Sequence, residues 1–371
     1  MAQKKKRVKF IIIFLVFVVY FLIAARPIPR ETVLTLNWIS SASSSSESGN
    51  FSNNLTPFTL GSRFGYVDST GQFVINRVKI NDIYLSQNMW TEYNAEPVNL
   101  IINNVFNDFE INIENPQGYP VLLDNRIFIL GSEQNSLSEI DNNGNIKWTY
   151  EFGAPLTSID AAAGLVVTGS LDGMIEVFNS EGERIFNESI GGSRYSVILG
   201  CAISRNGSRI AVICGIDQQR FLLLERFGAS SGEYRIVYHE FLESGFRRPV
   251  RVLFIDDDQR VIFEREGGIG CYSIRSRRTI NIPLDGEIAA IDESGGNGYF
   301  FIVTSNSFLQ KNIIGIRFPP DRLFGSSRTA AADSIFLKAP FKSSDVFFGR
   351  TDSTIVMGGG TVLISFDMED K

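Results

Sequence analysis

A strand–turn–strand pattern recurs along this chain and limits the folds open to it. It appears as "VLLDNRIFILGS" (121–132), "TSIDAAAGLVVTGS" (157–170), "CAISRNGSRIAVICG" (201–215), "LFIDDDQRVIFE" (253–264), "AAIDESGGNGYFFIVTS" (289–305) and, more loosely, "FFGRTDSTIVMGGG" (347–360). The turns open at Asp124, Asp160, Ser204, Asp256 and Asp292, which are 36, 44, 52 and 36 residues apart. A period near forty residues with loop insertions predicts a repeat architecture.

Each copy continues into a third strand, and several into a fourth. In the first copy the third strand "SLSEID" leads through the turn "DNNG" into "IKWTYEF" (146–152). The same turn recurs 38 residues later in "FNSEGERIF", where Gly182 takes the place of Gly144. Asp or Asn opens such a turn by accepting backbone N–H groups, and Gly permits the positive φ that it needs. Each repeat is therefore predicted to be a four-stranded antiparallel meander.

A single meander cannot bury both faces of its sheet. Second strands such as "RIFIL", "LVVTG" and "YFFIV" are apolar at consecutive positions, which is typical of strands covered on both sides. Stacking the repeats around an axis buries these faces and protects the edges. The sequence predicts an all-β fold, a β-propeller of about seven four-stranded blades within a range of six to eight. An N-terminal strand is expected to complete the last blade. The stretch 58–77 matches strands two to four of a repeat, and 78–118 is expected to form a divergent blade.

The alternation of "SRNGSRIAVI" and "DNNGNIKW" turns resembles the WD40-like and quinoprotein-like propeller superfamily. The likeness covers most of residues 58–367. The unit with Trp148 is similar to the Asp-Gly…Trp signature of quinoprotein repeats, and no Trp-Asp dipeptide occurs. The resemblance implies, for a quinone-dependent enzyme, adjacent cysteines, a calcium site and a stacking tryptophan. Adjacent cysteines are absent and the three tryptophans are scattered, so no cofactor is expected.

The N-terminus combines basic residues with an apolar run. "KKKRVKF" precedes sixteen apolar residues from Phe10 to Ala25. A helix of that length spans roughly 24 Å, and flanking Lys9 and Arg26 can snorkel to complete the span. We expect a single-pass anchor in the cytoplasmic membrane, with the N-terminus inside by the positive-inside rule and the propeller outside, periplasmic if the cell is bacterial. A cleaved signal peptide is the alternative, disfavoured by Ile23 or Leu22 at the −3 position. The expected organisation is an anchor over 1–30, a Ser-rich tether over 31–57 and a propeller over 58–371.

The charge distribution argues against nucleic-acid binding. Of 35 Lys/Arg and 41 Asp/Glu, seven of the basic residues and none of the acidic ones lie in 1–30. Residues 31–371 therefore carry 28 basic and 41 acidic groups, and an acidic body repels phosphate backbones.

Few residues point to catalysis. His239 is the only histidine, is expected on an outer strand, and leaves little scope for a metal cluster or a Ser-His-Asp triad. Cys201 and Cys214 are predicted to be diagonal neighbours in one hairpin. Because such neighbours are farther apart than a disulfide allows, free packed thiols are favoured over a bridge. Cys271 is expected in the core.

Two groups of charged residues are candidate sites. Asp124, Asp160, Asp256 and Asp292 recur at first turns, where they can ring one channel mouth and bind a cation or basic partner, or simply cap their own turns, which we favour. The arginines of "FRRPVR" and "RSRR" form either a docking patch or solvated loops. They are Arg247, Arg248, Arg251, Arg275, Arg277 and Arg278.

The function expected from these features is a membrane-anchored, non-catalytic scaffold that binds protein partners in the cell envelope. The outer-membrane assembly propellers of bacteria offer an analogy of fold and place. The alternative is an envelope glycan hydrolase or lyase that uses carboxylates at the channel mouth. Only the enzyme needs two carboxylates about 5–9.5 Å apart in a cleft.

Overall fold

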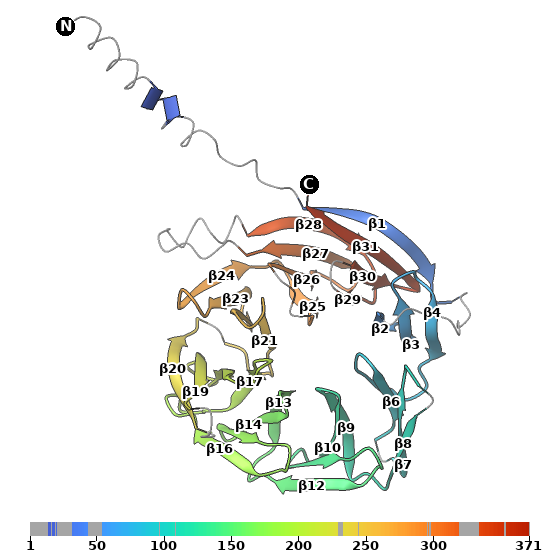
Figure 1. The fold of residues 1–371 in the computed structure, drawn as a ribbon, viewed down its shortest axis with the longest axis vertical. Helices are drawn as coiled ribbons and strands as arrows, with labels where there is room; N and C mark the ends of the chain where they lie inside the picture. The colour runs from blue at the N-terminus through green and yellow to red at the C-terminus, as the bar shows by residue number, and fades with distance from the viewer. Residues whose placement is uncertain are drawn as a thin grey trace, which may run out of the picture. The chain divides into compact units, whose positions relative to one another are not determined.

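A computed structural model describes residues 14–15, 17–18, 20, 32–43, 54–95, 97–107, 109–228, 233–243, 245–294, 296, 298–318, 334–351 and 354–370. The unit Leu36–Asp367 is a ring of eight antiparallel sheets (Figure 1). The all-β propeller is thus confirmed, with eight blades. That number is within the predicted range and one above the number we favoured.

The blades follow one another in chain order. We call the strands of a full blade A to D from the channel outward. Blade 1 is β2 (Leu55–Leu60), β3 (Arg63–Asp68) and β4 (Phe73–Val78). Blade 2 is β5 (Asp82–Leu85), β6 (Met89–Tyr93), β7 (Asn99–Asn104) and β8 (Glu110–Glu114). Blade 3 is β9 (Gly118–Leu123), β10 (Arg126–Gly131), β11 (Ser136–Ile140) and β12 (Ile146–Glu151). Blade 4 is β13 (Leu156–Ala162), β14 (Leu165–Ser170), β15 (Met174–Phe178) and β16 (Arg184–Ser189).

The second half of the ring repeats this order. Blade 5 is β17 (Ile198–Ile203), β18 (Arg209–Cys214), β19 (Arg220–Arg226) and β20 (Tyr234–Phe241). Blade 6 is β21 (Val252–Ile255), β22 (Arg260–Arg265), β23 (Gly268–Ser273) and β24 (Arg278–Pro283). Blade 7 is β25 (Glu287–Ile291), β26 (Tyr299–Ser305), β27 (Gln310–Arg317) and β28 (Ile335–Lys342). Blade 8 is β29 (Phe347–Thr351), β30 (Thr354–Gly359), β31 (Val362–Asp370) and β1 (Thr32–Ser41).

The last blade is closed by a strand from the other end of the chain. β1 lies beside β31, and Ala42 N–H donates to Thr361 O at 2.8 Å. The prediction of an N-terminal closing strand is confirmed, but the tether expected over 31–57 is wrong where β1 and the start of β2 lie. The misleading feature was the Ser-rich composition of 40–50, which begins at the end of β1. The remainder of that segment, 44–53, lies outside the described residues.

Blade 1 explains why the number of blades expected from the sequence was one too low. Its β3–β4 turn has the Asx–Gly form of the C–D turns in blades 3 and 4: Asp68 Oδ1 accepts the N–H of Thr70 and Gln72, and Gly71 has φ +85°. β2, β3 and β4 are therefore strands B to D, as predicted for 58–77. The divergent blade predicted over 78–118 is β5–β8. The stretch 58–77 is thus a blade of its own and not only a partner for the final blade.

The hydrophobic core lies between blades. Successive clusters of buried side chains each join two neighbouring blades, for example Ile175 and Val177 of blade 4 with Val212 and Leu222 of blade 5. Between blades 7 and 8 the rings of Phe301 and Phe348 stack 5.8 Å apart. Each sheet thus buries its faces against its neighbours, which is why consecutive apolar residues occur in the second strands.

Tryptophans on outer strands join adjacent blades at the Asx–Gly turns. Gly182 has φ +78° in the C–D turn of blade 4, and a Cβ there would meet the Trp148 ring of blade 3 at 2.4 Å. Gly71 of blade 1 lies similarly close to the ring of Trp38 on β1. The Trp38 Nε1 donates to Ser69 O at 2.9 Å. β1 therefore closes blade 8 and also holds it against blade 1.

Of the predicted anchor from Phe10 to Ala25, only 14, 15, 17, 18 and 20 are described, and these are helical. Among the described residues, no helix has the length and apolar character needed to cross a membrane. The remainder of the predicted anchor lies outside the described residues.

Candidate functional site

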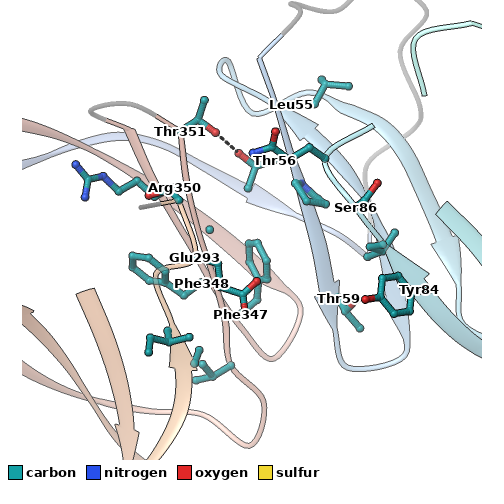
Figure 2. A pocket seen from close by; sticks show the side chains of 18 of the residues that line it. Leu55, Thr56, Thr59, Tyr84, Ser86, Glu293, Phe347, Phe348, Arg350 and Thr351 are labelled. Atoms are coloured by element: carbon teal, nitrogen blue, oxygen red, sulfur yellow. Dashed lines mark hydrogen bonds between the residues drawn. The ribbon is translucent and has the colours of Figure 1, made fainter. Parts of the chain in front are cut away.

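A cavity of about 780 Å³ lies along the inner strands of the ring (Figure 2). Strands β2, β5, β9, β25 and β29 contribute its wall, which mixes hydroxyl groups with aromatic rings. Thr56 and Thr351 join β2 to β29 through hydroxyls 3.3 Å apart. Tyr84 and Phe347 supply rings, and Glu293 is a carboxylate in the wall. The cavity wall therefore mixes apolar side chains and hydroxyl groups with three charged residues, Arg251, Glu293 and Arg350.

Asp124, Asp256 and Asp292 lie at A–B turns at one end of the channel, whereas Asp160 lies within β13, opposite Val167 and ahead of its turn, so the prediction that it opens the turn is wrong. Each of these carboxylates reaches a neighbouring blade. Asp124 of blade 3 accepts the Gly164 N–H of blade 4 at 3.4 Å. Asp160 of blade 4 accepts the Ile203 N–H of blade 5 at 2.8 Å, and the adjacent Ala161 N–H at 2.9 Å. These two carboxylates thus link blade 3 to blade 4 and blade 4 to blade 5.

The same arrangement continues through blades 6 to 8. Asp256 accepts the Gly298 N–H of blade 7 at 3.1 Å and pairs with Arg260 of its own blade at 3.1 Å. Asp292 of blade 7 pairs with Arg350 of blade 8 at 3.1 Å and accepts Ser294 N–H of its own turn at 3.1 Å. Turn capping is correct for Asp292, but as a general explanation it misses the links between blades.

The one serine in the series behaves differently. Ser204 of blade 5 is buried and its Oγ accepts Arg209 N–H of its own turn at 2.9 Å. At the junction of blades 5 and 6 the carboxylate comes from the following blade: Asp258 of blade 6 accepts the Arg205 N–H of blade 5 at 2.9 Å. Sequence reasoning missed Asp258, although the run "DDD" offered three carboxylates at this turn.

The carboxyls inside the channel have raised pKa values. Burial raises the pKa of Asp160 to about 6, against the lowering effect of its two backbone donors, and the charges of Asp124 and Glu293 add to the rise. Burial also raises the pKa of Glu293, which Arg251 opposes and Asp292 reinforces. Burial raises the pKa of Tyr84 in the same electrostatic neighbourhood. Glu293 was not predicted, though its position directly after Asp292 was a usable signal.

The structure does not bring the two groups of predicted docking arginines together. The registers Val252↔Phe263, Arg260↔Ser273 and Ser273↔Arg278 place them at opposite ends of blade 6. Arg247, Arg248 and Arg251 lie ahead of β21, on the face formed by B–C turns and D–A connections, which we call the B–C face. Arg275 and Arg277 lie in the C–D turn and Arg278 begins β24, at the opposite face. A single patch made of all six is therefore not present.

Several other predicted residues are located by the sheet registers. His239 is exposed on β20, the outer strand of blade 5, opposite Leu222. Cys201 is opposite Val212 and Cys214 opposite Ile198, and all three cysteines are free and buried. Burial raises the pKa of Cys201 to about 12 and that of Cys214 to about 11. Within the described parts of the chain, no three His, Cys, Asp or Glu side chains are grouped so as to hold a metal ion.

Comparisons with known proteins agree on the fold. A family model described as "beta-propeller protein" matches residues 1–370. A protein of Treponema pallidum (strain Nichols), described as an uncharacterized protein, is 26% identical over 314 residues, covering 85% of this chain and 77% of its own length. The crystal structure of BamB from Moraxella catarrhalis is similar with a TM-score of 0.54 and 12% identity, over 90% of this chain and 100% of that one. The computationally designed protein Ika8 is similar with a TM-score of 0.57 and 14% identity, over 85% and 94%.

Proposed function

The chain belongs to a family of β-propeller proteins, and from this premise we propose that it is a non-catalytic protein-interaction scaffold, anchored in the cytoplasmic membrane with its propeller in the cell envelope. We further propose that it is a divergent member of the WD40-like and quinoprotein-like superfamily. The likeness to BamB and Ika8 concerns the fold alone, so it supports this placement and nothing about partners.

The observation that supports the proposal is that the channel-mouth carboxylates are engaged in contacts between blades. Asp124, Asp160 and Asp256 accept backbone N–H groups from the next blade, and Asp292 is paired with Arg350. Such carboxylates hold the ring rigid, and a rigid ring presents its loops in fixed positions. Binding through loops is then the role that the arrangement favours.

The proposed location rests on the N-terminal sequence. Basic residues at 4–7 precede the apolar run from Phe10 to Ala25, and the acidic body follows it. The test is fractionation of cells that express the full chain. We expect the protein in the membrane pellet, released by detergent but not by carbonate at high pH, with the propeller digested when protease is added outside the membrane. Release by carbonate, or protection of the propeller from external protease, would refute the location.

One observation keeps the glycan hydrolase or lyase as a second candidate. The raised pKa of Asp160, about 6, is of the kind that a general acid needs near neutral pH. The test incubates the purified full chain with isolated peptidoglycan and measures soluble sugar products. We expect none above the buffer level. Products that are formed by the wild type and lost in Asp160→Asn would replace the scaffold by the enzyme.

A further inference from the structure

Three arginine–aromatic pairs gather on the B–C face of blades 4 to 6. Arg194 lies over the Tyr195 ring at 5.4 Å, Arg220 over Phe241 at 5.7 Å and Arg248 over Phe246 at 4.4 Å. The first pair comes from the β16–β17 connection, the second from the start of β19 and the end of β20, and the third from the β20–β21 connection. We call these six residues the arginine–aromatic surface.

Hydrogen bonds between the loops make this surface continuous. The Arg220 guanidinium donates to Gly191 O, and Ile216 N–H donates to Tyr195 O at 3.1 Å, so the first loop is fixed to the start of blade 5's third strand. The Gln219 side chain donates to Phe246 O, and Leu242 N–H donates to Gln219 O at 2.8 Å. The three pairs therefore occupy one loop assembly held in place by blade 5.

Two of the three rings on this surface are exposed, while Phe246 is half-buried against the core between blades 5 and 6. Tyr195 is 54% exposed and Phe241 57% exposed, although they are large side chains beside well-packed strands. Tyr and Arg are enriched among the residues that contribute most to protein–protein binding, because they combine a large contact area with directional hydrogen bonds. An arginine already lying over a ring is partly ordered, which reduces the entropy lost on binding.

The charge of the loops indicates the chemistry of the partner. Residues 191–197, 215–220 and 242–250 contain four arginines, no lysine and two acidic residues, Asp217 and Glu243, on a body that is acidic overall. Asp217 is occupied within the loops: Ser193 Oγ donates to it, Arg194 N–H donates to it at 3.3 Å, and these contacts lower its pKa. Arginine binds carboxylates in a bidentate geometry that lysine does not offer. A lipid-binding surface clusters about four to eight Lys/Arg, whereas here the four arginines alternate with acidic residues and Arg248 is paired with Glu264.

We propose that the arginine–aromatic surface docks a protein partner that presents carboxylates around an apolar centre. This inference deepens the scaffold role and rests on it. It retains Arg248 from the arginine patch considered from the sequence, but that guanidinium is already paired with the buried Glu264, NH2 to Oε1 at 2.5 Å. Arg194, Arg220 and the aromatic rings are therefore the residues that meet the partner.

The test is selection of a displayed library of random 12-residue peptides on the purified full chain in mild detergent. We expect enrichment of peptides that combine Asp or Glu with apolar residues. The double variant Tyr195→Ala/Phe241→Ala should bind an enriched peptide at least tenfold more weakly, as should Arg194→Glu, when measured by fluorescence anisotropy. Replacing the Glu and Asp of the peptide by Gln and Asn should weaken it similarly.

Phe308→Ala is the matched control, because Phe308 is 77% exposed in the β26–β27 turn on the same face but outside the surface. It should bind within about twofold of wild type, and unchanged thermal unfolding of each variant shows that the fold is intact. No enrichment, enriched peptides without acidic residues, or equal binding by the double variant would overturn the proposal. So would displacement of the peptide by phosphatidylglycerol vesicles, or self-association of the chain that the double variant abolishes.

These outcomes are separate from those that test the proposed function. Peptide binding elsewhere on the propeller would leave the scaffold role standing and remove this surface from it. Failure of the membrane fractionation would remove the proposed location and leave the peptide result unaffected.

Discussion

Replacing Asp292 with alanine should destabilise the propeller strongly. Asp292 is 1% exposed and its partner Arg350, on the next blade, has a side chain that is 5% exposed, with 3.1 Å between Oδ2 and NH1. Arg350 also donates to Tyr299 O at 3.0 Å and lies over the Phe301 ring at 5.8 Å. Removing one partner of a buried ion pair leaves the other charge uncompensated, which costs about 3–5 kcal/mol.

Urea unfolding followed by intrinsic fluorescence measures this cost. With an m value of about 3 kcal/mol/M, the midpoint should fall by about 1–1.7 M. The matched control is Asp285→Ala, which removes the exposed pair between Asp285 and Lys338 at 2.6 Å. That pair is screened by water, so its loss should shift the midpoint far less.

A double variant distinguishes the charge effect from lost packing. Asp292→Ala/Arg350→Met removes both charges and places an apolar chain in the site, so most of the lost stability should return. If Asp292→Ala proves no more destabilising than Asp285→Ala, the buried pair does not hold blades 7 and 8 together and the reasoning is refuted.

Three further changes test other parts of the structure. Because the folded pKa of Asp160, about 6, exceeds its ordinary value of 3.8, the folded state binds the extra proton more tightly. Wild-type stability should therefore fall relative to Asp160→Asn as the pH rises from 4 to 7, by at most about 3 kcal/mol, and a constant difference in urea midpoints would contradict this. The buried thiols of Cys201, Cys214 and Cys271 should react with a thiol reagent only when the protein is unfolded. Fewer than three reactive thiols in the unfolded, unreduced chain would reveal a disulfide. Trp38→Ala should lower the unfolding free energy by about 2 kcal/mol because it removes the contact between β1 and blade 1, and an unchanged urea midpoint would argue against closure by β1.

The propeller was predictable because its repeats are written in local patterns. An apolar second strand and a turn opened by Asp or Ser are visible without knowing what they contact. The same patterns predicted that Cys201 and Cys214 lie in one hairpin, which the pairing of β17 with β18 confirms. The role of 32–41 was less visible, because β1 matches no repeat until its partner β31 is known.

The candidate site was predictable only in part. The recurrence of Asp124, Asp160, Asp256 and Asp292 near first turns was readable. The structure places three of them at equivalent A–B turns and Asp160 within β13. The hydrogen-bond donors of these carboxylates lie on the next blade. Which donors they meet depends on how the blades stack, and no local sequence pattern indicates this. The arginine–aromatic surface was missed for the same reason, since the packing of the β16–β17 connection against blade 5 brings Gly191 to Arg220 and Tyr195 to Ile216.

We propose that the channel-mouth carboxylates join blades and do not form a catalytic pair. Amide hydrogen exchange at Ile203 measures the contact on which this depends. The Ile203 N–H donates to Asp160 Oδ2 at 2.8 Å across the junction of blades 4 and 5. A hydrogen bond to a charged group contributes about 1.5–3 kcal/mol, so Asp160→Ala should speed this exchange at least about tenfold. The amide of Val212, within β18, should keep its rate. Exchange at Ile203 that is equally fast in wild type and variant would contradict the claim.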